Sequence, residues 1–147
     1  YIMYSKVNHE LPENGHHLSL SYRLHVDSWD LNSHTFEGSY SFPFMEKHKL
    51  EPFARIYHQQ AASFHTRTIN YSGSGTFDTV TLPEYASADA RLAQMLSTTV
   101  GAKFRYMTSK TGSIDFRAAY YYREYTNAIL SSDDALFFVV DLGKSFQ

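Results

Sequence analysis

The sequence predicts an all-β fold, an antiparallel transmembrane β-barrel in which residues 1–147 form a single domain. This domain is expected to be the C-terminal part, about seven strands, of a larger up-and-down barrel. Three observations lead to this prediction. Apolar and polar residues alternate with a period of two, charges are confined to one parity of the alternating segments, and short and longer connections alternate along the chain.

Composition sets the outer bounds of the prediction. The chain has 147 residues, of which 43% are hydrophobic and 16% aromatic, and this suits one folded, aromatic-rich β domain. The formal net charge of -2 gives no reason to expect a nucleic-acid partner. The absence of cysteine excludes disulfides and thiolate metal sites. No apolar run approaches the roughly eighteen residues that a membrane-spanning helix needs.

Each predicted strand shows the two-residue period in turn. From Leu18 to Val26 the even positions are apolar and the odd positions are polar. The same alternation predicts further strands over residues 34–44, 50–59, 88–107, 113–124 and 136–146, with a partial strand at residues 1–9. In all six complete strands the even-numbered residues form the apolar side.

Charge separates the two sides of these strands. Counted to Tyr122 in the strand over residues 113–124, the even side carries a single charge, Lys144, whereas the odd side carries six of the seven arginines. The charged residues expected to line the lumen of the barrel are Arg23, Glu37, Glu51, Arg55, Asp89, Arg91, Lys103, Arg105, Asp115, Arg117 and Arg123. Two roles are open for them: a field that orients small polar or anionic solutes, or ion pairs that hold the strands in register.

Two further features indicate that the apolar side faces outward. Tyr and Phe gather near the strand ends, as they do in the interfacial girdles of membrane barrels. The connections are short at residues 10–16, 45–49 and 109–113, medium at 27–33 and 126–134, and long at 61–87. Short and longer connections therefore alternate, as expected for a barrel with short periplasmic turns and longer external loops.

Three segments, YRLHVDSWDLNSHTFE, EPFARIYHQQAASF and YASADARL, resemble an uncharacterised family of bacterial outer-membrane β-barrels, known only as a domain of unknown function. The most specific residues of the resemblance are Asp27, Trp29, Ser33, His34 and Thr35 in one turn, and Gln60, Ala62 and Phe64 in one segment. The resemblance covers roughly residues 22–106. It implies a barrel in the bacterial outer membrane and no particular activity. Because members of the family are longer, it also implies that this chain is the C-terminal portion of a bigger barrel.

The two ends of the chain carry further expectations. Unpaired strand edges are costly in hydrocarbon, so we expect additional strands before Tyr1 rather than several chains sharing one barrel. The terminal segment DLGKSFQ resembles the last strand of outer-membrane barrels, which the barrel-assembly machinery recognises by pairing with it. Asp141, Gly143 and Phe146 fit this assembly signal, and its spacing predicts at least one residue after Gln147, a Phe.

Catalytic and metal chemistry have weaker support. His25 and His34 flank one predicted turn and are the histidines best placed for a shared metal, but solvated strand ends explain them more simply. Ser63 with His58 or His65 is the nearest approach to a hydrolase triad. We therefore expect no catalytic residue, no metal site and no cofactor.

The expected function is a non-enzymatic channel or scaffold for passage or anchoring of a solute or a partner protein. The long connection at residues 61–87 is the candidate constriction or partner-binding loop through its aromatic residues Phe64, Tyr71, Phe77 and Tyr85, with an exposed hairpin as the alternative. Expected partners are outer-membrane lipid, the barrel-assembly machinery and other envelope proteins. Two other functions stay open: a soluble lipocalin-like barrel that binds an apolar ligand, and a lipid-modifying outer-membrane enzyme.

Overall fold

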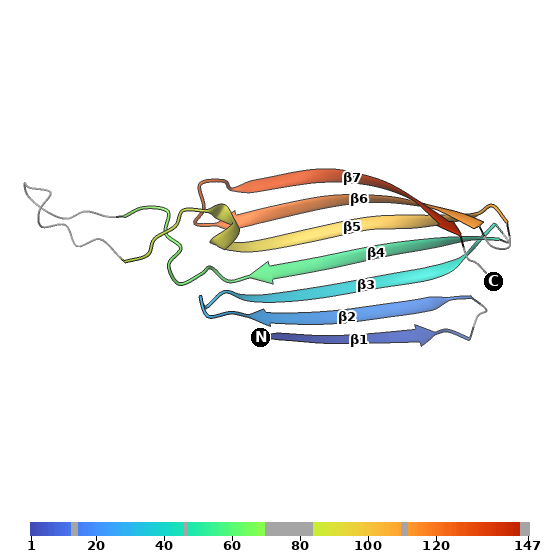
Figure 1. Ribbon diagram of the computed structural model, residues 1–147, viewed down its shortest axis with the longest axis horizontal. Helices are drawn as coiled ribbons and strands as arrows, with labels where there is room; N and C mark the ends of the chain where they lie inside the picture. Colours follow the sequence, from blue (N-terminus) through green and yellow to red (C-terminus); the bar gives the residue numbers. More distant parts are fainter. Residues whose placement is uncertain (13–14, 46, 70–83, 110–111, 145–147) are drawn as a thin grey trace, which may run out of the picture.

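Seven strands form one sheet in the computed structural model, which describes residues 1–12, 15–45, 47–69, 84–109 and 112–144. The strands are β1 (Ile2–Glu10), β2 (His17–Val26), β3 (Asn32–Phe44), β4 (His48–Gln59), β5 (Gln94–Met107), β6 (Gly112–Thr126) and β7 (Ser132–Lys144). Each strand pairs antiparallel with the next strand in the chain, so the sheet is an up-and-down meander with β1 and β7 at its edges (Figure 1). The predicted all-β class and the seven antiparallel strands are confirmed.

Several predicted strand boundaries need correction. The strands β3, β4 and β7 begin earlier than predicted, at Asn32, His48 and Ser132, and two further corrections concern residues 1–9 and 88–107. The segment at the N-terminus is a complete strand of 9 residues rather than a partial one. The predicted strand over residues 88–107 begins only at Gln94, because the Asp89 side chain accepts a hydrogen bond from the Arg91 backbone N–H. That bond caps a short 3-10 helix, η2 (Ala90–Leu92), and this local structure replaces the strand there.

The predicted alternation of connection lengths is wrong for two of the longer connections. Residues 27–31 join β2 to β3 and residues 127–131 join β6 to β7, and neither is longer than the β1–β2 connection at residues 11–16. The strands reach further into these connections than the polar residues indicated. Only the β4–β5 connection, residues 60–93, is long. It lies at the end of the sheet that we call the loop end, and the opposite end is the turn end (Figure 1).

The sheet is a single layer with little interior. The buried hydrophobic residues of the described ranges are mostly small, and a cluster of Ala93, Tyr125 and Ala128 sits at the loop end. No large described side chain is fully buried. Nor does any helix among the described residues have the length and apolar character needed to span a bilayer. The sheet therefore presents both of its faces.

Strand register assigns every strand residue to one of these two faces. The apolar face holds the even-numbered residues of β2–β7 and the odd-numbered residues of β1, as the pairs Met3 with Leu24 and Phe104 with Phe116 illustrate. The charged face holds the remaining residues. Two acidic residues that the sequence pattern overlooked, Glu124 and Asp134, also lie on the apolar face, close to the loop end. On β6 and β7, the uncharged part of the apolar face therefore begins past Glu124 and Asp134 and lies closer to the turn end than to the loop end.

Candidate functional site

The candidate site is the charged face, because nine of the eleven predicted lumen residues lie on it. These nine are Arg23 on β2, Glu37 on β3, Glu51 and Arg55 on β4, Lys103 and Arg105 on β5, and Asp115, Arg117 and Arg123 on β6. The predicted placement of Asp89 and Arg91 on a strand is wrong, because both belong to the η2 turn, where they form an ion pair with each other at 2.6 Å. Hydrogen bonds from the Arg91 side chain and backbone lower the pKa of the Asp89 carboxyl to about 2.

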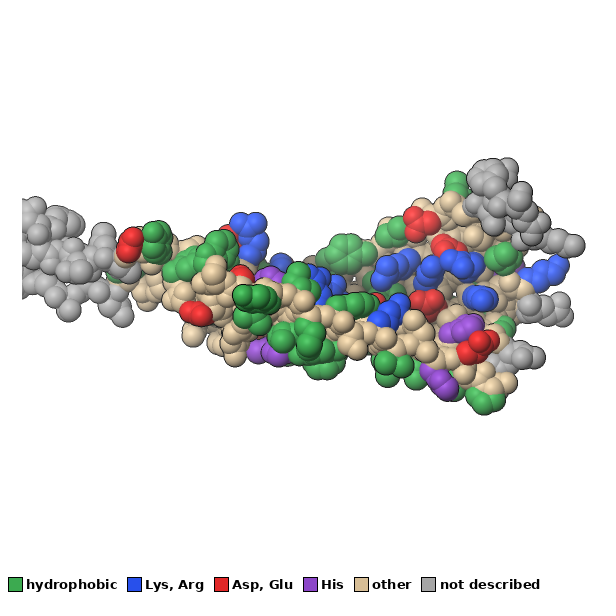
Figure 2. Space-filling view, turned by 60° about the horizontal axis from the view of Figure 1, so that its bottom comes forward, with side chains coloured by type: hydrophobic (Ala, Val, Ile, Leu, Met, Phe, Trp, Pro, Cys, Tyr) green, Lys and Arg blue, Asp and Glu red, His purple; other side chains and the backbone are tan. Residues whose placement is uncertain are grey.

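The charged face is the hollowed side of the sheet. Three hollows lie on it, and their linings come from β1–β4, from β2–β5 and from β4–β7. Figure 2 shows Lys and Arg side chains gathered there with intervening acidic ones. The sheet thus curves with its charges inside the curve.

A cluster of three charged residues occupies the turn end of this face. Arg105 donates two hydrogen bonds to Asp115, from Nε to Oδ1 at 2.7 Å and from Nη2 to Oδ2 at 2.8 Å. The Lys103 ammonium lies 3.2 Å from the same carboxylate. Asp141 of β7 stands directly opposite Asp115 in the register, so two like charges face each other across β6 and β7.

An ion pair between Arg123 and Asp133 joins β6 to β7 at the loop end of the charged face. Arg123 Nε donates to Asp133 Oδ1 at 2.8 Å, and the Arg123 guanidinium lies 4.8 Å from the centre of the Tyr125 ring. Asp133 was missed by the sequence reasoning because the last strand was expected to start after it. The signal that could have found it is its odd parity, shared with Asp141.

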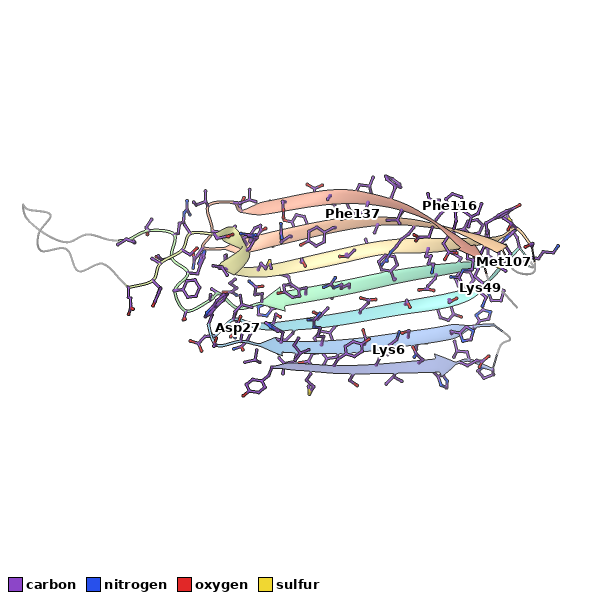
Figure 3. The ribbon with its side chains drawn as sticks, in the orientation of Figure 1. Lys6, Asp27, Lys49, Met107, Phe116 and Phe137 are labelled. Carbon is purple, nitrogen blue, oxygen red and sulfur yellow. The ribbon has the colours of Figure 1, made fainter. Side chains whose placement is uncertain are left out.

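Between these ends lies a group of cations without comparable pairing, which we call the basic cluster: Lys6, Arg23 and Arg55. They line one hollow of about 250 Å³ together with a single carboxylate, Glu37, and Lys6 extends it to the edge strand β1 (Figure 3). Lys6 was not among the predicted lumen residues, although its parity opposite Met3 and Val7 was readable in the sequence.

An apolar patch interrupts the charged face over β4–β7. Phe53 packs there because Gly101 leaves room for its ring: a Cβ on Gly101 would lie 2.7 Å from Phe53 Cζ. The Arg117 guanidinium covers the same ring, 4.4 Å from its centre. Phe137 and Val139 extend the patch on β7, so the middle of the last strand is apolar on both faces (Figure 3).

The loop end is organised by the two motifs that carried the family resemblance. Asp27 Oδ1 accepts hydrogen bonds from the backbone N–H of Trp29 at 2.8 Å and of Leu31 at 3.1 Å, which fixes the β2–β3 turn. The Phe64 ring meets the Trp29 ring edge-on, with centroids 5.7 Å apart. The long connection is thereby attached to this turn.

Buried Gln59 holds η2 against the sheet. Its Nε2 donates to the backbone carbonyls of Arg91 at 2.9 Å and Ala93 at 3.0 Å. The sequence reasoning missed this role because the two segments are far apart in the chain. Of the loop aromatics predicted as partner or constriction residues, Phe64 and Tyr85 line one hollow with Trp29. Tyr71 and Phe77 lie outside the described residues.

The metal and hydrolase alternatives gain no geometric support. His25 and His34 lie on opposite faces, because His25 pairs with Ser33 while His34 pairs with Leu24. In the described ranges no group of three or more His, Cys, Asp or Glu side chains is arranged to hold a metal ion. Nor does any hydrogen bond between described side chains join Ser63 to His58 or His65.

The predicted assembly signal is only partly within the described chain. Asp141 and Gly143 lie on the charged face of β7, where Asp141 pairs with Asp115 and Gly143 with Ser113. Phe146 lies outside the described residues.

Aromatic and histidine rings form a belt on the apolar face at the turn end. The His48 and Tyr106 rings stack at 4.5 Å, and Phe104 contacts both Phe44 and Phe116. The Tyr40 hydroxyl is hydrogen-bonded to His16 Nδ1 at 2.7 Å. Rings with polar edges therefore flank the uncharged middle of the face.

Comparison with models of known protein families gives a match over most of the chain. The family described as "Protein of unknown function (DUF3570)" matches residues 2–136. No curated protein matches the chain, and no solved structure does. The match extends beyond residues 22–106, over which the sequence resemblance was expected.

Proposed function

We propose that this chain, which belongs to the family described as "Protein of unknown function (DUF3570)", forms part of the wall of a β-barrel in a bacterial outer membrane. It acts there as a non-enzymatic channel or scaffold, in contact with outer-membrane lipid and, during insertion, with the barrel-assembly machinery. The observation that supports this best is the two-faced sheet, in which large apolar side chains lie exposed on one face and charges line the hollow of the other.

The apolar face is too exposed for a protein surrounded by water on that side. On β7 alone, Leu136, Phe138 and Val140 are 61%, 72% and 61% exposed, and comparable side chains continue across the sheet to Val7 on β1. Soluble monomers rarely expose contiguous apolar patches beyond a few hundred Å². Lipid chains cover such a face, and the antiparallel ladders satisfy the backbone groups that hydrocarbon would leave unpaired.

The dimensions and the rims of the face suit the same environment. The strands run from 9 residues in β1 to 15 in β6, against the roughly nine to eleven that a tilted strand needs to cross a bilayer. The ring belt at the turn end matches the aromatic girdle that membrane barrels place at an interface. Glu124 and Asp134 at the loop end would mark the other boundary with water.

The direction of curvature favours a membrane barrel over the soluble lipocalin-like alternative. A lipocalin encloses its apolar side chains and holds an apolar ligand among them. Here the hollows are lined largely by charged and hydroxyl side chains, with one apolar patch around Phe53. Such a lining suits water and small polar solutes.

Cell fractionation tests the proposal. The full-length protein, expressed behind a bacterial secretion signal in a Gram-negative host, is expected in the outer membrane, resistant to carbonate extraction and dependent on detergent for solubility. Its folded form should migrate faster than its boiled form on SDS gels. A protein recovered from the periplasm without detergent would refute the membrane proposal and support the lipocalin-like one. Conductance steps in planar bilayers would then distinguish a channel from a scaffold.

A further inference from the structure

The hollow lined by the basic cluster carries an excess of positive charge. Its lining includes Lys6, Arg23 and Arg55 but one carboxylate, Glu37, so its formal net charge is +2. The volume of the hollow is about 250 Å³. At roughly 30 Å³ per water molecule, it admits a small solute with part of its hydration shell.

The excess is not neutralised within the described chain. Elsewhere on the charged face, Asp115 pairs with Lys103 and Arg105, Asp133 pairs with Arg123, and the Arg117 guanidinium lies over the Phe53 ring without an acidic partner among the described residues. Among the described residues no ion pair joins Lys6, Arg23 or Arg55 to an acid. Register places Arg55 opposite Glu37, and Glu37 opposite Ser21, which in turn faces Lys6. Arg23 lines the same hollow, so three cations share it with one carboxylate.

Hydroxyl groups complete a lining that can donate hydrogen bonds. The hydroxyl side chains that share the hollow are Ser19, Ser21, Thr35 and Ser39. Guanidinium groups present planar forks of N–H donors that match the oxygen atoms of carboxylates and phosphates, and hydroxyls add single donors. Cations and neutral donors around one hollow favour an oxyanion over a cation or an apolar molecule.

We propose that the basic cluster is a binding site for a small oxyanion, such as a phosphate group, on the inner wall of the barrel. This inference rests on the proposed function, because the cluster faces a pore only if the chain forms part of a barrel wall. In such a pore, the excess positive charge would favour anions. Binding depends on the local excess of charge rather than on the net charge of the chain, which is -2. It is expected to weaken as salt rises, since exposed charges are screened over about 8 Å at physiological ionic strength.

The test measures two properties of the full-length protein. Binding of inorganic phosphate to the detergent-solubilised protein is followed by calorimetry, and the reversal potential in planar bilayers under a KCl gradient gives the ion preference. The variants R23Q and R55Q each remove one charge from the cluster, and E37Q removes its carboxylate. R91Q is the matched control, because Arg91 is paired with Asp89 outside the charged face. Heat-modifiable mobility checks that every variant folds.

Each cation removed should weaken phosphate binding by about threefold to tenfold, the factor expected for a unit charge some 6 Å away at a water-exposed site. E37Q should tighten it by a similar factor, and R91Q should leave it within about twofold. Absence of phosphate binding, or equal weakening by R23Q and R91Q, would overturn the inference. Conductance without anion preference or phosphate binding would overturn it while leaving the channel intact. Phosphate binding with the expected variant order, but without conductance, would support the site and refute the channel.

Discussion

Arginine substitutions on the two faces of β2 give the most direct prediction of the proposed membrane placement. Leu20 lies on the apolar face, opposite Val7 and Gly38, six residues from the loop end of its strand at Val26. Six residues span about 20 Å along a strand. At a tilt of about 40° this is about 15 Å of depth, near the middle of an apolar band about 25 Å tall.

Leu20→Arg should therefore carry the full cost of an arginine in hydrocarbon. That cost is about 2–4 kcal/mol at the midplane, which corresponds to a folding equilibrium constant lower by roughly 30-fold to 900-fold. Leu24→Arg, about 5 Å from the loop end, should cost about 1 kcal/mol. Ser19→Arg is the control on the charged face. It adds a cation to the water-exposed hollow that also holds Lys6, Arg23 and Arg55, so it should cost about 0.5–1 kcal/mol through repulsion, still well below Leu20→Arg.

The assay is reversible urea unfolding of the full-length protein in lipid vesicles, with the folded fraction read from its mobility on unboiled SDS gels. The test compares the destabilisation caused by arginine at two different depths, Leu20 and Leu24. An apolar face packed inside a soluble barrel would make Leu24→Arg as costly as Leu20→Arg, and a face exposed to water would make both as mild as Ser19→Arg. Either result would refute the assignment of this face to lipid.

Three other substitutions or titrations test packing and charge. Gly101→Ala should destabilise the protein by about 1–3 kcal/mol in the same urea assay, because its Cβ would lie 2.5 Å from a backbone oxygen of β6. The Cβ of Gly38→Ala would lie 3.2 Å from the end of the Leu20 side chain and at an ordinary 4.0 Å from the Ser19 backbone oxygen. This substitution should be nearly neutral, so equal losses would contradict the packing argument. Asp115→Asn should cost about 1–3 kcal/mol, because it leaves Lys103 and Arg105 without their acceptor. Asp141→Asn should be neutral or stabilising, because it removes a negative charge that faces Asp115. The reverse order of the two effects would be inconsistent with this register. The Asp89 carboxyl should titrate in NMR spectra with a midpoint of about 2, against an ordinary 3.8. Because its pKa is lowered by folding, the stabilisation of η2 is present above pH 3.8 and is lost as the pH falls through 2; a midpoint near 3.8 would show that the ion pair is absent in solution.

The alternation of residue types was enough to predict the strands and their faces. In a strand, successive side chains point to opposite sides, so parity alone placed Arg55 with Glu37 and apart from Ile56. The prediction failed where a local hydrogen bond competed with this periodicity, as at Asp89 and Arg91. It also failed at the strand ends, where Asn32 and Ser132 join strands although polar residues usually mark turns.

The sequence by itself determined that this chain is a two-faced antiparallel sheet, because side-chain parity is a property of neighbouring residues. Only the tertiary structure decided which charges meet, because register is a relation between strands. Parity could not tell that Asp115 pairs with Arg105 while facing Asp141, or that Lys6 joins Arg23 and Arg55 around one carboxylate. Nor could it tell that the charged face is the hollow one, since curvature arises from the twist and pairing of all the strands together.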